Sequence, residues 1–254
     1  LTNTEVKNSG IAGNIEMSIG DPTWTTVSTD WAPSSAGSNS KPAIADMDGD
    51  GDLDMLVGNS SSGFLYHRNT GSNSSPTWSQ ISADWIPAVT TSQNGPTFAD
   101  MDADGDFDLI FGDLNGRVNY FRNTGSAASS TWTSVSSDWT GSDHGDYTSI
   151  DMVDIDNDTD LDMFISVDAG AVHYYQNTGS SSSPAWTYTS GNYASLSGNV
   201  GTYIDIDFAD VDNDGDYDMV VGNIDGYVYF YRNTGTAVNA SWTQVSSDWI
   251  GCIG

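Results

Sequence analysis

Short stretches of alternating apolar and polar residues follow one another along the chain, and no segment has the 3.6-residue period of an amphipathic helix. One part of the chain shows this well, with strand-like segments at 96–100, 108–112, 117–122 and 131–136. The breaks between them contain Asn-Gly, Asn-Thr-Gly-Ser and serine-rich sequences, whose residues favour turns. The pattern predicts an all-β chain in which four short antiparallel strands make one unit.

This unit repeats along the chain. The tripeptide Asn-Thr-Gly occurs at residues 69–71, 123–125, 177–179 and 233–235. A tryptophan recurs with nearly the same period, at Trp24, Trp78, Trp132, Trp186 and Trp242. Aspartate runs begin at Asp46, Asp100, Asp154 and Asp210. Four strands in each repeat of 54 to 56 residues predict a β-propeller rather than a solenoid, whose repeats are much shorter.

The two ends of the chain set the expected number of blades. Residues 1–31 contain Trp24 and Trp31 but no aspartate run, and the segment after Trp249 is where a further inner strand would begin. We therefore expect one domain of five blades, the fifth combining three N-terminal strands with a C-terminal inner strand. The expected repeats are about 1–40, 41–94, 95–146, 147–202 and 203–254. The alternatives are that the chain is part of a larger ring, or that a neighbouring molecule donates the missing strand.

The charge of the chain excludes two classes of partner. There are 35 acidic and 6 basic residues, which give a formal net charge of −29. Binding of nucleic acid or of an anionic membrane surface requires a basic face, so we expect neither. No apolar stretch reaches the length of about 18 residues that spanning a membrane requires, so no membrane insertion is expected. Nine Trp, twelve Tyr and eight Phe favour a packed core over disorder.

The acidic residues are concentrated in the four aspartate runs, each with five carboxylates in nine residues. These carboxylates would repel one another without a cation, and calcium takes six to eight oxygen ligands. The first, third and fifth carboxylates converge when the backbone curls, glycine at the sixth position permits the turn, the seventh offers a carbonyl and the ninth closes the shell. The candidate metal-binding residues are Asp46, Asp48, Asp50, Asp52, Asp54, Asp100, Asp102, Asp104, Asp106, Asp108, Asp154, Asp156, Asp158, Asp160, Asp162, Asp210, Asp212, Asp214, Asp216 and Asp218.

Other interpretations of the runs fit less well. An EF-hand requires a glutamate at the twelfth position. The chain instead has strand residues there, namely Val57, Phe111, Ile165 and Val221. A solvated acidic loop does not explain the same aspartate phase in four copies, and magnesium prefers to keep several waters. In the third run Thr159 replaces the glycine, so we expect a strained turn or a lower affinity there.

The pattern Asp-x-Asp-x-Asp-Gly-x-x-Asp between two strands resembles the FG-GAP/VCBS repeat, found in the propeller of integrin α-subunits and in many secreted adhesins and lectins. The resemblance covers residues 45–254 well and 1–31 partially. It implies about four calcium ions, each held by the first, third, fifth and ninth positions of a run. In the first run these are Asp46, Asp48, Asp50 and Asp54.

Calcium also bears on location. Cys252 is the only cysteine, so the chain can form no internal disulfide. Calcium ions stabilise a fold in place of disulfides where calcium is abundant. Because calcium is scarce in the cytosol, we expect an extracellular or cell-surface protein.

We expect no enzymatic activity. The histidines, His67, His144 and His173, lie in different repeats, and motifs of serine hydrolases, zinc proteases and phosphate-binding loops are absent. A repeated surface suits binding better, so the predicted function is a recognition or adhesion module for a glycan or a protein partner. The alternatives are a structural subunit of an extracellular filament or surface assembly, joined through the incomplete blade, and a non-catalytic domain of a secreted polysaccharide-degrading enzyme.

Two sets of residues are candidates for ligand contact. The first is the aromatic residue seven positions after each repeated tryptophan, at Trp31, Trp85, Trp139, Tyr193 and Trp249. The repeated tryptophan itself is better explained by packing between blades. The second set is the connections between blades, 32–41, 86–95, 140–147 and 194–205, which differ among repeats and are expected on one face, where loops carry function. Arginines that precede Asn-Thr-Gly are expected to pair with nearby acids, at Arg68, Arg122 and Arg232, with Gln176 in the third repeat.

Overall fold

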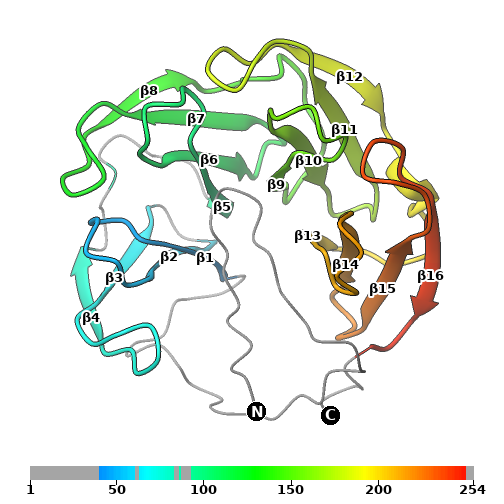
Figure 1. Ribbon diagram of the computed structural model, residues 1–254, viewed down its shortest axis with the longest axis horizontal. Helices are drawn as coiled ribbons and strands as arrows, with labels where there is room; N and C mark the ends of the chain where they lie inside the picture. The colour runs from blue at the N-terminus through cyan, green and yellow to red at the C-terminus, as the bar shows by residue number, and fades with distance from the viewer. Residues whose placement is uncertain (1–39, 61–62, 83–85, 87–92, 250–254) are drawn as a thin grey trace. The chain divides into compact units, whose positions relative to one another are not determined.

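Each repeat that contains an aspartate run folds into one antiparallel sheet of four strands (Figure 1). The computed structural model describes residues 40–60, 63–82, 86 and 93–249. Blade 1 consists of β1 (Lys41–Ala45), β2 (Asp54–Gly58), β3 (Leu65–Asn69) and β4 (Trp78–Ser82). Blade 2 consists of β5 (Gln93–Ala99), β6 (Asp108–Asp113), β7 (Val118–Asn123) and β8 (Trp132–Ser136).

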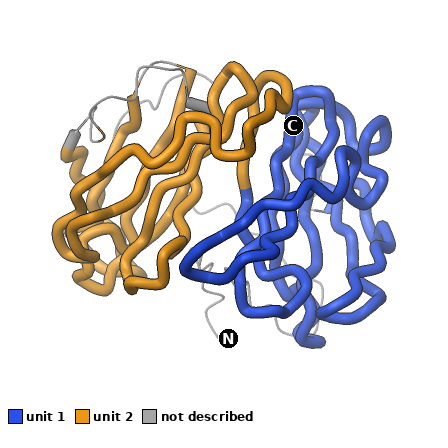
Figure 2. The backbone as a smooth tube through the Cα atoms, turned by 90° about the horizontal axis from the view of Figure 1, so that it is seen from above, with its two compact units in different colours: residues 1–25, 151–254 blue, residues 26–150 orange. Residues whose placement is uncertain are grey.

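The second half of the chain repeats this arrangement. Blade 3 consists of β9 (Ser149–Val153), β10 (Asp162–Ser166), β11 (Val172–Asn177) and β12 (Trp186–Ser190), followed by a 3₁₀ helix, η1 (Tyr193–Ser195). Blade 4 consists of β13 (Asp205–Ala209), β14 (Asp218–Gly222), β15 (Val228–Asn233) and β16 (Trp242–Ser246). The described residues divide into two compact units, one within 26–150 and the other within 151–254 (Figure 2). Among the described helices, none has the length and apolar character needed to cross a membrane.

The prediction of an all-β propeller is confirmed, but the prediction of five blades is wrong. The described residues form four blades of four strands, and each complete blade has its own inner strand and aspartate run. The fifth blade was inferred from Trp24 and Trp31, a repeat that lacks both features. A tryptophan spacing alone therefore does not define a blade, because the strands also need partners for their backbone groups. The segments assigned to that blade, 1–31 and 250–254, lie outside the described residues.

Burial decreases from the inner strands of a blade to its outer strand. The second strand is fully buried in three blades, as in β2, β6 and β10, and its apolar run matches that position. The outer strand β8 is mostly exposed, which agrees with its Thr- and Ser-rich alternation. The third and fourth strands shift register at one point in every blade, between Tyr120 and Phe121 in blade 2.

The cores lie between neighbouring blades of each unit. In the first unit, Phe64 of blade 1 packs edge-on against Phe111 of blade 2, with ring centroids 5.2 Å apart, and Trp132 covers the same cluster. In the second unit, Phe164 of blade 3 contacts Phe208 of blade 4 at 4.6 Å between centroids. Trp132 and its counterpart in blade 4 are half-buried packing residues, as expected of the repeated tryptophan.

The antiparallel strand order divides the loops of a blade between two ends. Loops from the first to the second strand and from the third to the fourth lie at one end, which we call the aspartate-loop end. Hairpins between the second and third strands lie at the opposite end, together with the connections to the next blade. We call this the connection end. In blade 2, for example, His144 of the 140–147 connection donates its backbone N–H to the carbonyl of Gly116 in the hairpin.

Candidate metal centres

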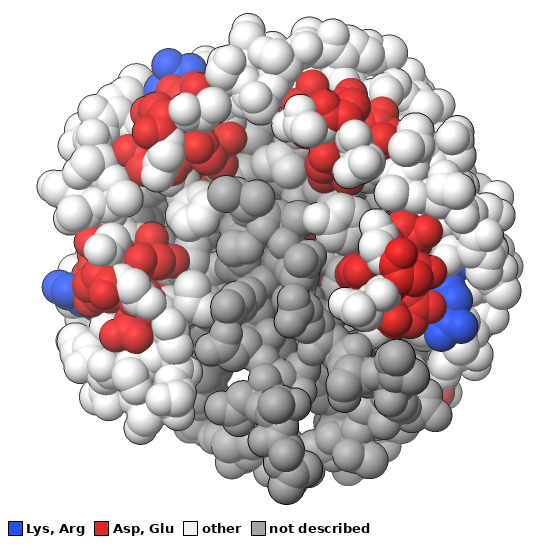
Figure 3. Space-filling view, in the orientation of Figure 1, with Lys and Arg blue, Asp and Glu red and all other residues white. Residues whose placement is uncertain are grey.

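Each aspartate loop gathers three carboxylates at its tip. The first, third and fifth positions of a run place carboxylate oxygens within 4.8 Å of one another in all four blades. Figure 3 shows the acidic side chains as separate clusters rather than a diffuse surface. The clusters are Asp46, Asp48 and Asp50; Asp100, Asp102 and Asp104; Asp154, Asp156 and Asp158; and Asp210, Asp212 and Asp214.

The first aspartate of each run organises the loop backbone. In blade 1, Oδ1 of Asp46 accepts the N–H groups of Gly49 and Asp50 at 2.8 and 3.2 Å, and Oδ2 accepts that of Gly51 at 3.0 Å. The other blades repeat the last two hydrogen bonds at 3.0 to 3.2 Å. The loop therefore curls around one carboxylate, as the spacing predicted.

The curl requires left-handed backbone at two positions. The fourth residue of each run has φ between 59° and 71°, in Gly49, Ala103, Asn157 and Asn213. The sixth has φ of 93° to 95° where it is glycine, whereas Thr159 has φ of 80°. A β-branched residue in this region is strained. The predicted strain in the third turn is thus present.

Several carboxylate oxygens in the loops are buried and accept no hydrogen bond from any described residue. They are Oδ1 of the third-position residues Asp48, Asp102, Asp156 and Asp212, and Oδ1 of the seventh-position residues Asp106, Asp160 and Asp216. A buried carboxylate oxygen with no donor is costly. The same atoms recur in successive blades, and carboxylate oxygens are the ligands that calcium prefers. The residues of the loops therefore fit a calcium ion.

Crowding also affects proton binding in these loops. Burial, followed by the charges of Asp158, Asp156 and Asp154, raises the pKa of Asp160 to about 6. Burial and the equivalent neighbours raise the pKa of Asp216 to about 6 as well. A bound divalent cation would oppose both effects, because it favours the ionised carboxylates.

The ninth aspartate of each run has its hydrogen-bond partners within the blade. Asp108 is fully buried, and Oδ1 accepts the N–H of Asn123 at 2.8 Å while Oδ2 accepts that of Met101 at 3.2 Å. The hydroxyl of Tyr120 donates to Oδ2 at 2.8 Å. Burial raises the pKa of this carboxyl to about 6, and the three donors limit the rise. The carboxylates at the first, third and fifth positions of the run are therefore clustered, whereas the ninth is hydrogen-bonded within its own blade.

The tyrosine is a residue that the sequence analysis missed. Its signal is a spacing of twelve residues after the ninth aspartate, as in Asp108 and Tyr120. Blades 1 and 3 repeat the hydrogen bond at 2.8 and 2.9 Å, through Tyr66 and Tyr174. Blade 4 has Phe230 at this place, so Asp218 is held by backbone N–H groups alone among the hydrogen bonds found there.

The Asn-Thr-Gly motif closes the turn beside the loop. The side-chain oxygen of Asn123 accepts the N–H groups of Gly125 and Thr131 at 3.0 and 2.8 Å, and its backbone N–H donates to Asp108. The same contacts occur in all four blades. The motif thus connects the turn between the outer strands to the aspartate loop, which explains why the two recur together.

The predicted arginine pairs are confirmed, and all contact the third aspartate. Nε of Arg122 lies 3.0 Å from Oδ2 of Asp102, and Nε of Arg232 lies 2.9 Å from Oδ2 of Asp212. Arg68 pairs with Asp48 and also with Asp50. In blade 3 the amide of Gln176 donates to Asp156 instead.

The proposed ligand aromatics that are described use one face for packing. Trp139 stacks on Tyr120 at 4.3 Å between centroids, and Trp249 stacks on Phe230 at 4.8 Å. Tyr193, in η1, contacts Phe164 and other rings of its core. All three are half-buried, so their recurrence has a packing explanation. Trp31 and Trp85 lie outside the described residues.

The histidines occupy the expected kinds of position. His67 and His173 lie in the third strands of their blades, and burial lowers the pKa of both. His144 is buried in the 140–147 connection, where Nε2 lies 2.8 Å from Oγ1 of Thr140.

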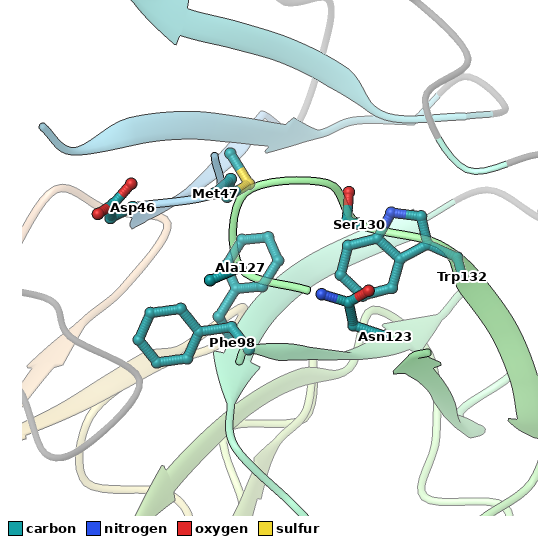
Figure 4. A pocket seen from close by; sticks show the side chains of 8 residues that line it. Asp46, Met47, Phe98, Asn123, Ala127, Ser130 and Trp132 are labelled. Carbon is teal, nitrogen blue, oxygen red and sulfur yellow. The ribbon is translucent and has the colours of Figure 1, made fainter. Parts of the chain in front are cut away.

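A small hollow lies between the loop of blade 1 and the turn of blade 2 (Figure 4). Asp46, Met47 and Trp132 are among the residues that line it. A Cβ atom at Gly49 would lie 3.2 Å from the backbone nitrogen of Ala128 in that turn. The aspartate loop of blade 1 is therefore in close contact with the next blade.

A family model for the FG-GAP-like repeat matches the chain twice, over residues 46–111 and 100–165. Each match begins at an aspartate run and ends in the second strand of the following blade. No curated protein matches the chain. Among solved structures, a lectin of Agrocybe aegerita, described as specifically recognising non-reducing terminal N-acetylglucosamine, is 21% identical with a TM-score of 0.49. The match covers 83% of this chain and 53% of the lectin, so the chain spans about half of the lectin's length. The family model covers residues 46–165, and the four-stranded blades with their repeated carboxylate loops form a β-propeller that is consistent with FG-GAP-like repeats.

Proposed function

We propose that the chain is a calcium-stabilised, non-catalytic recognition module that works outside the cell or at its surface. The observation that carries the calcium part is the repeated set of buried carboxylate oxygens without hydrogen-bond donors, at the same positions of successive loops. Asp46, Asp48 and Asp50 and their counterparts supply the clustered oxygens. Each ion stabilises the folded loop because the unfolded chain offers no such cluster.

The recognition surface that we propose lies at the connection end of blade 4. The 194–205 connection meets the β14–β15 hairpin there, where Ile224 donates its backbone N–H to the carbonyl of Thr202 at 3.2 Å. Three large side chains are exposed beside this contact: Tyr203 by 45%, Ile224 by 62% and Tyr227 by 40%. We call these three residues the connection patch. Exposed aromatic groups of this kind are typical of binding surfaces.

The division of the two ends supports this assignment. The aspartate loops occupy the end that recurs in all blades, whereas the connections differ in sequence and length. A recurring site is suited to a structural ion, and a variable site is suited to a ligand. The ligand is a glycan or a protein partner, and tyrosine rings suit both.

A glycan array tests the recognition part. The labelled protein is applied in calcium, together with Tyr203→Ala and with Tyr188→Ala as the matched control. Tyr188 is 54% exposed on β12, outside the connection patch. We expect binding that Tyr203→Ala weakens at least about tenfold and Tyr188→Ala leaves unchanged, as for a central contact residue. Absence of glycan binding, or equal loss in both variants, would contradict a glycan site at this patch.

The alternative of a structural subunit joined through an incomplete blade depended on the fifth blade. The described residues form four blades, so that alternative is not carried further.

A further inference from the structure

The four aspartate loops provide an internal comparison, because they share their fold and most of their sequence. They differ in the residue that contacts the third carboxylate from the third strand of the blade. In blades 2 and 4 this is a guanidinium, with Nε of Arg122 3.0 Å from Asp102 and Nε of Arg232 2.9 Å from Asp212. In blade 3, Nε2 of Gln176 donates to Oδ2 of Asp156 at 2.6 Å.

The two kinds of partner hold the carboxylate in the same way. Arginine and glutamine both contact Oδ2, and in every blade Oδ1 is buried without a donor among the described residues. Oδ2 is therefore used to orient the side chain, and Oδ1 is left for a cation. What changes between the blades is one unit of positive charge beside the cluster.

This charge acts directly on a divalent ion in the loop. The three clustered carboxylates carry about three negative charges, and a paired guanidinium offsets one of them in blades 1, 2 and 4. A unit charge about 6 Å from a divalent cation, in a medium close to water, changes the affinity by about tenfold. The arginines are partly exposed, so solvent screening keeps the change in calcium affinity close to this tenfold value.

We propose that the loop of blade 3 binds calcium about tenfold more tightly than the other three loops, and that Gln176 is the positioning residue responsible. This inference rests on the proposed calcium binding. It means that the protein fills one site before the others as calcium rises, so blade 3 is stabilised first.

The strained turn at Thr159 does not oppose the proposed order of calcium affinity among the four loops. Thr159 has the left-handed φ of the glycines in the other loops, and its N–H donates to Oδ2 of Asp154 at 3.0 Å as theirs do to the first aspartate. Binding therefore requires no further change of the backbone at this position. The strain lowers the stability of the fold rather than the affinity for the ion.

Isothermal titration calorimetry of the full chain with calcium chloride tests the inference. We expect one tight site and three weaker sites in the unmodified protein. Gln176→Arg should convert the tight site to a weak one, and Arg122→Gln should create a second tight site, each by about tenfold. Both variants place at one blade the residue that another blade already has, and circular dichroism confirms that they fold.

Arg117→Gln is the matched control, because Arg117 pairs with Asp138 at 3.3 Å and not with an aspartate loop. It removes one positive charge and should leave the affinities of the tight site and of the three weaker calcium sites unchanged. Four equal sites, or classes that neither Gln176→Arg nor Arg122→Gln moves, would overturn the inference while leaving calcium binding intact. Absence of any calcium binding would overturn the proposed function and this inference together.

Discussion

The hydroxyl of Tyr120 donates a hydrogen bond to Oδ2 of Asp108 at 2.8 Å, and both residues are buried. The pair joins the third strand of blade 2 to the end of its aspartate loop. A buried carboxylate is costly unless its oxygens accept hydrogen bonds. The Tyr120 hydroxyl therefore stabilises Asp108, which is buried in the sheet without an ion-pair partner among the described residues. Blade 4 carries Phe230 at the same place and lacks this donor.

The separate variants Tyr120→Phe and Phe230→Tyr should change the free energy of unfolding in opposite directions. Tyr120→Phe removes a donor from a buried charge and should lower the free energy of unfolding by about 1–3 kcal/mol. Phe230→Tyr adds a donor near Asp218 and should raise it by about 1 kcal/mol. Both rings stack on a tryptophan, Trp139 or Trp249, so the packing is retained. Urea unfolding in chelator measures the differences in the free energy of unfolding. Two changes of the same sign would contradict a stabilising hydrogen bond from the tyrosine hydroxyl to the ninth aspartate.

The turn of blade 3 should be improved by glycine. Thr159→Gly relieves a β-branched residue at φ of 80° and should raise the free energy of unfolding by about 1 kcal/mol. Gly215→Thr in blade 4 is the reciprocal variant. A Cβ atom at Gly215 would meet nothing within 4 Å, so its cost comes from the backbone alone. Denaturant midpoints of the two variants should move in opposite directions, and unchanged midpoints would show that the left-handed position costs little.

Calcium should raise the melting temperature strongly. An ion at about 100 times its dissociation constant contributes about 2.7 kcal/mol per site to the folded state. Four such sites in a chain of this size should raise Tm by more than about 10 °C. Differential scanning calorimetry in calcium and in chelator measures the shift, with magnesium as the control cation. An unchanged Tm would contradict a structural role for calcium.

Without calcium, acidification should stabilise the protein. Burial raises the pKa of Asp54 and Asp108 to about 6 and that of Asp162 to about 7, from an ordinary value of 3.8. The folded state therefore binds protons more readily than the unfolded state, and stability is lost as pH rises from about 4 to about 7. Asp50, whose pKa is lowered by the N–H of Asp52, opposes this from an exposed position.

The measurement is urea unfolding in chelator at about pH 7.5 and about pH 5, where the free energy of unfolding should be greater at the lower pH. In saturating calcium the trend should reverse, because the ion binds only ionised carboxylates. The same slope in both buffers would contradict binding of calcium to ionised carboxylates of the aspartate loops.

Much of the fold was predictable because its information is local and repeated. The aspartate runs, the Asn-Thr-Gly turns and the alternating outer strands, such as 131–136, each depend on neighbours within a few residues. The strand predicted at 108–112 is observed as β6, Asp108–Asp113. The convergence of the first, third and fifth carboxylates followed from the spacing alone, as did the strain at Thr159.

The tertiary structure decided what depends on partners distant in the sequence. The ninth aspartate, assigned to the metal shell from its spacing, accepts hydrogen bonds from the tyrosine twelve residues later and from two backbone N–H groups. The prediction of five blades was wrong because strand pairing, and not tryptophan spacing, defines a blade. The sequence predicted that the arginines pair with nearby acids, but only the third strand placed against the loop showed that Arg122 and its counterpart Gln176 contact the third aspartate. Sequence spacing determines which groups lie near one another along a turn, whereas antiparallel pairing determines which groups meet across it, because strands bring together residues that the chain keeps apart.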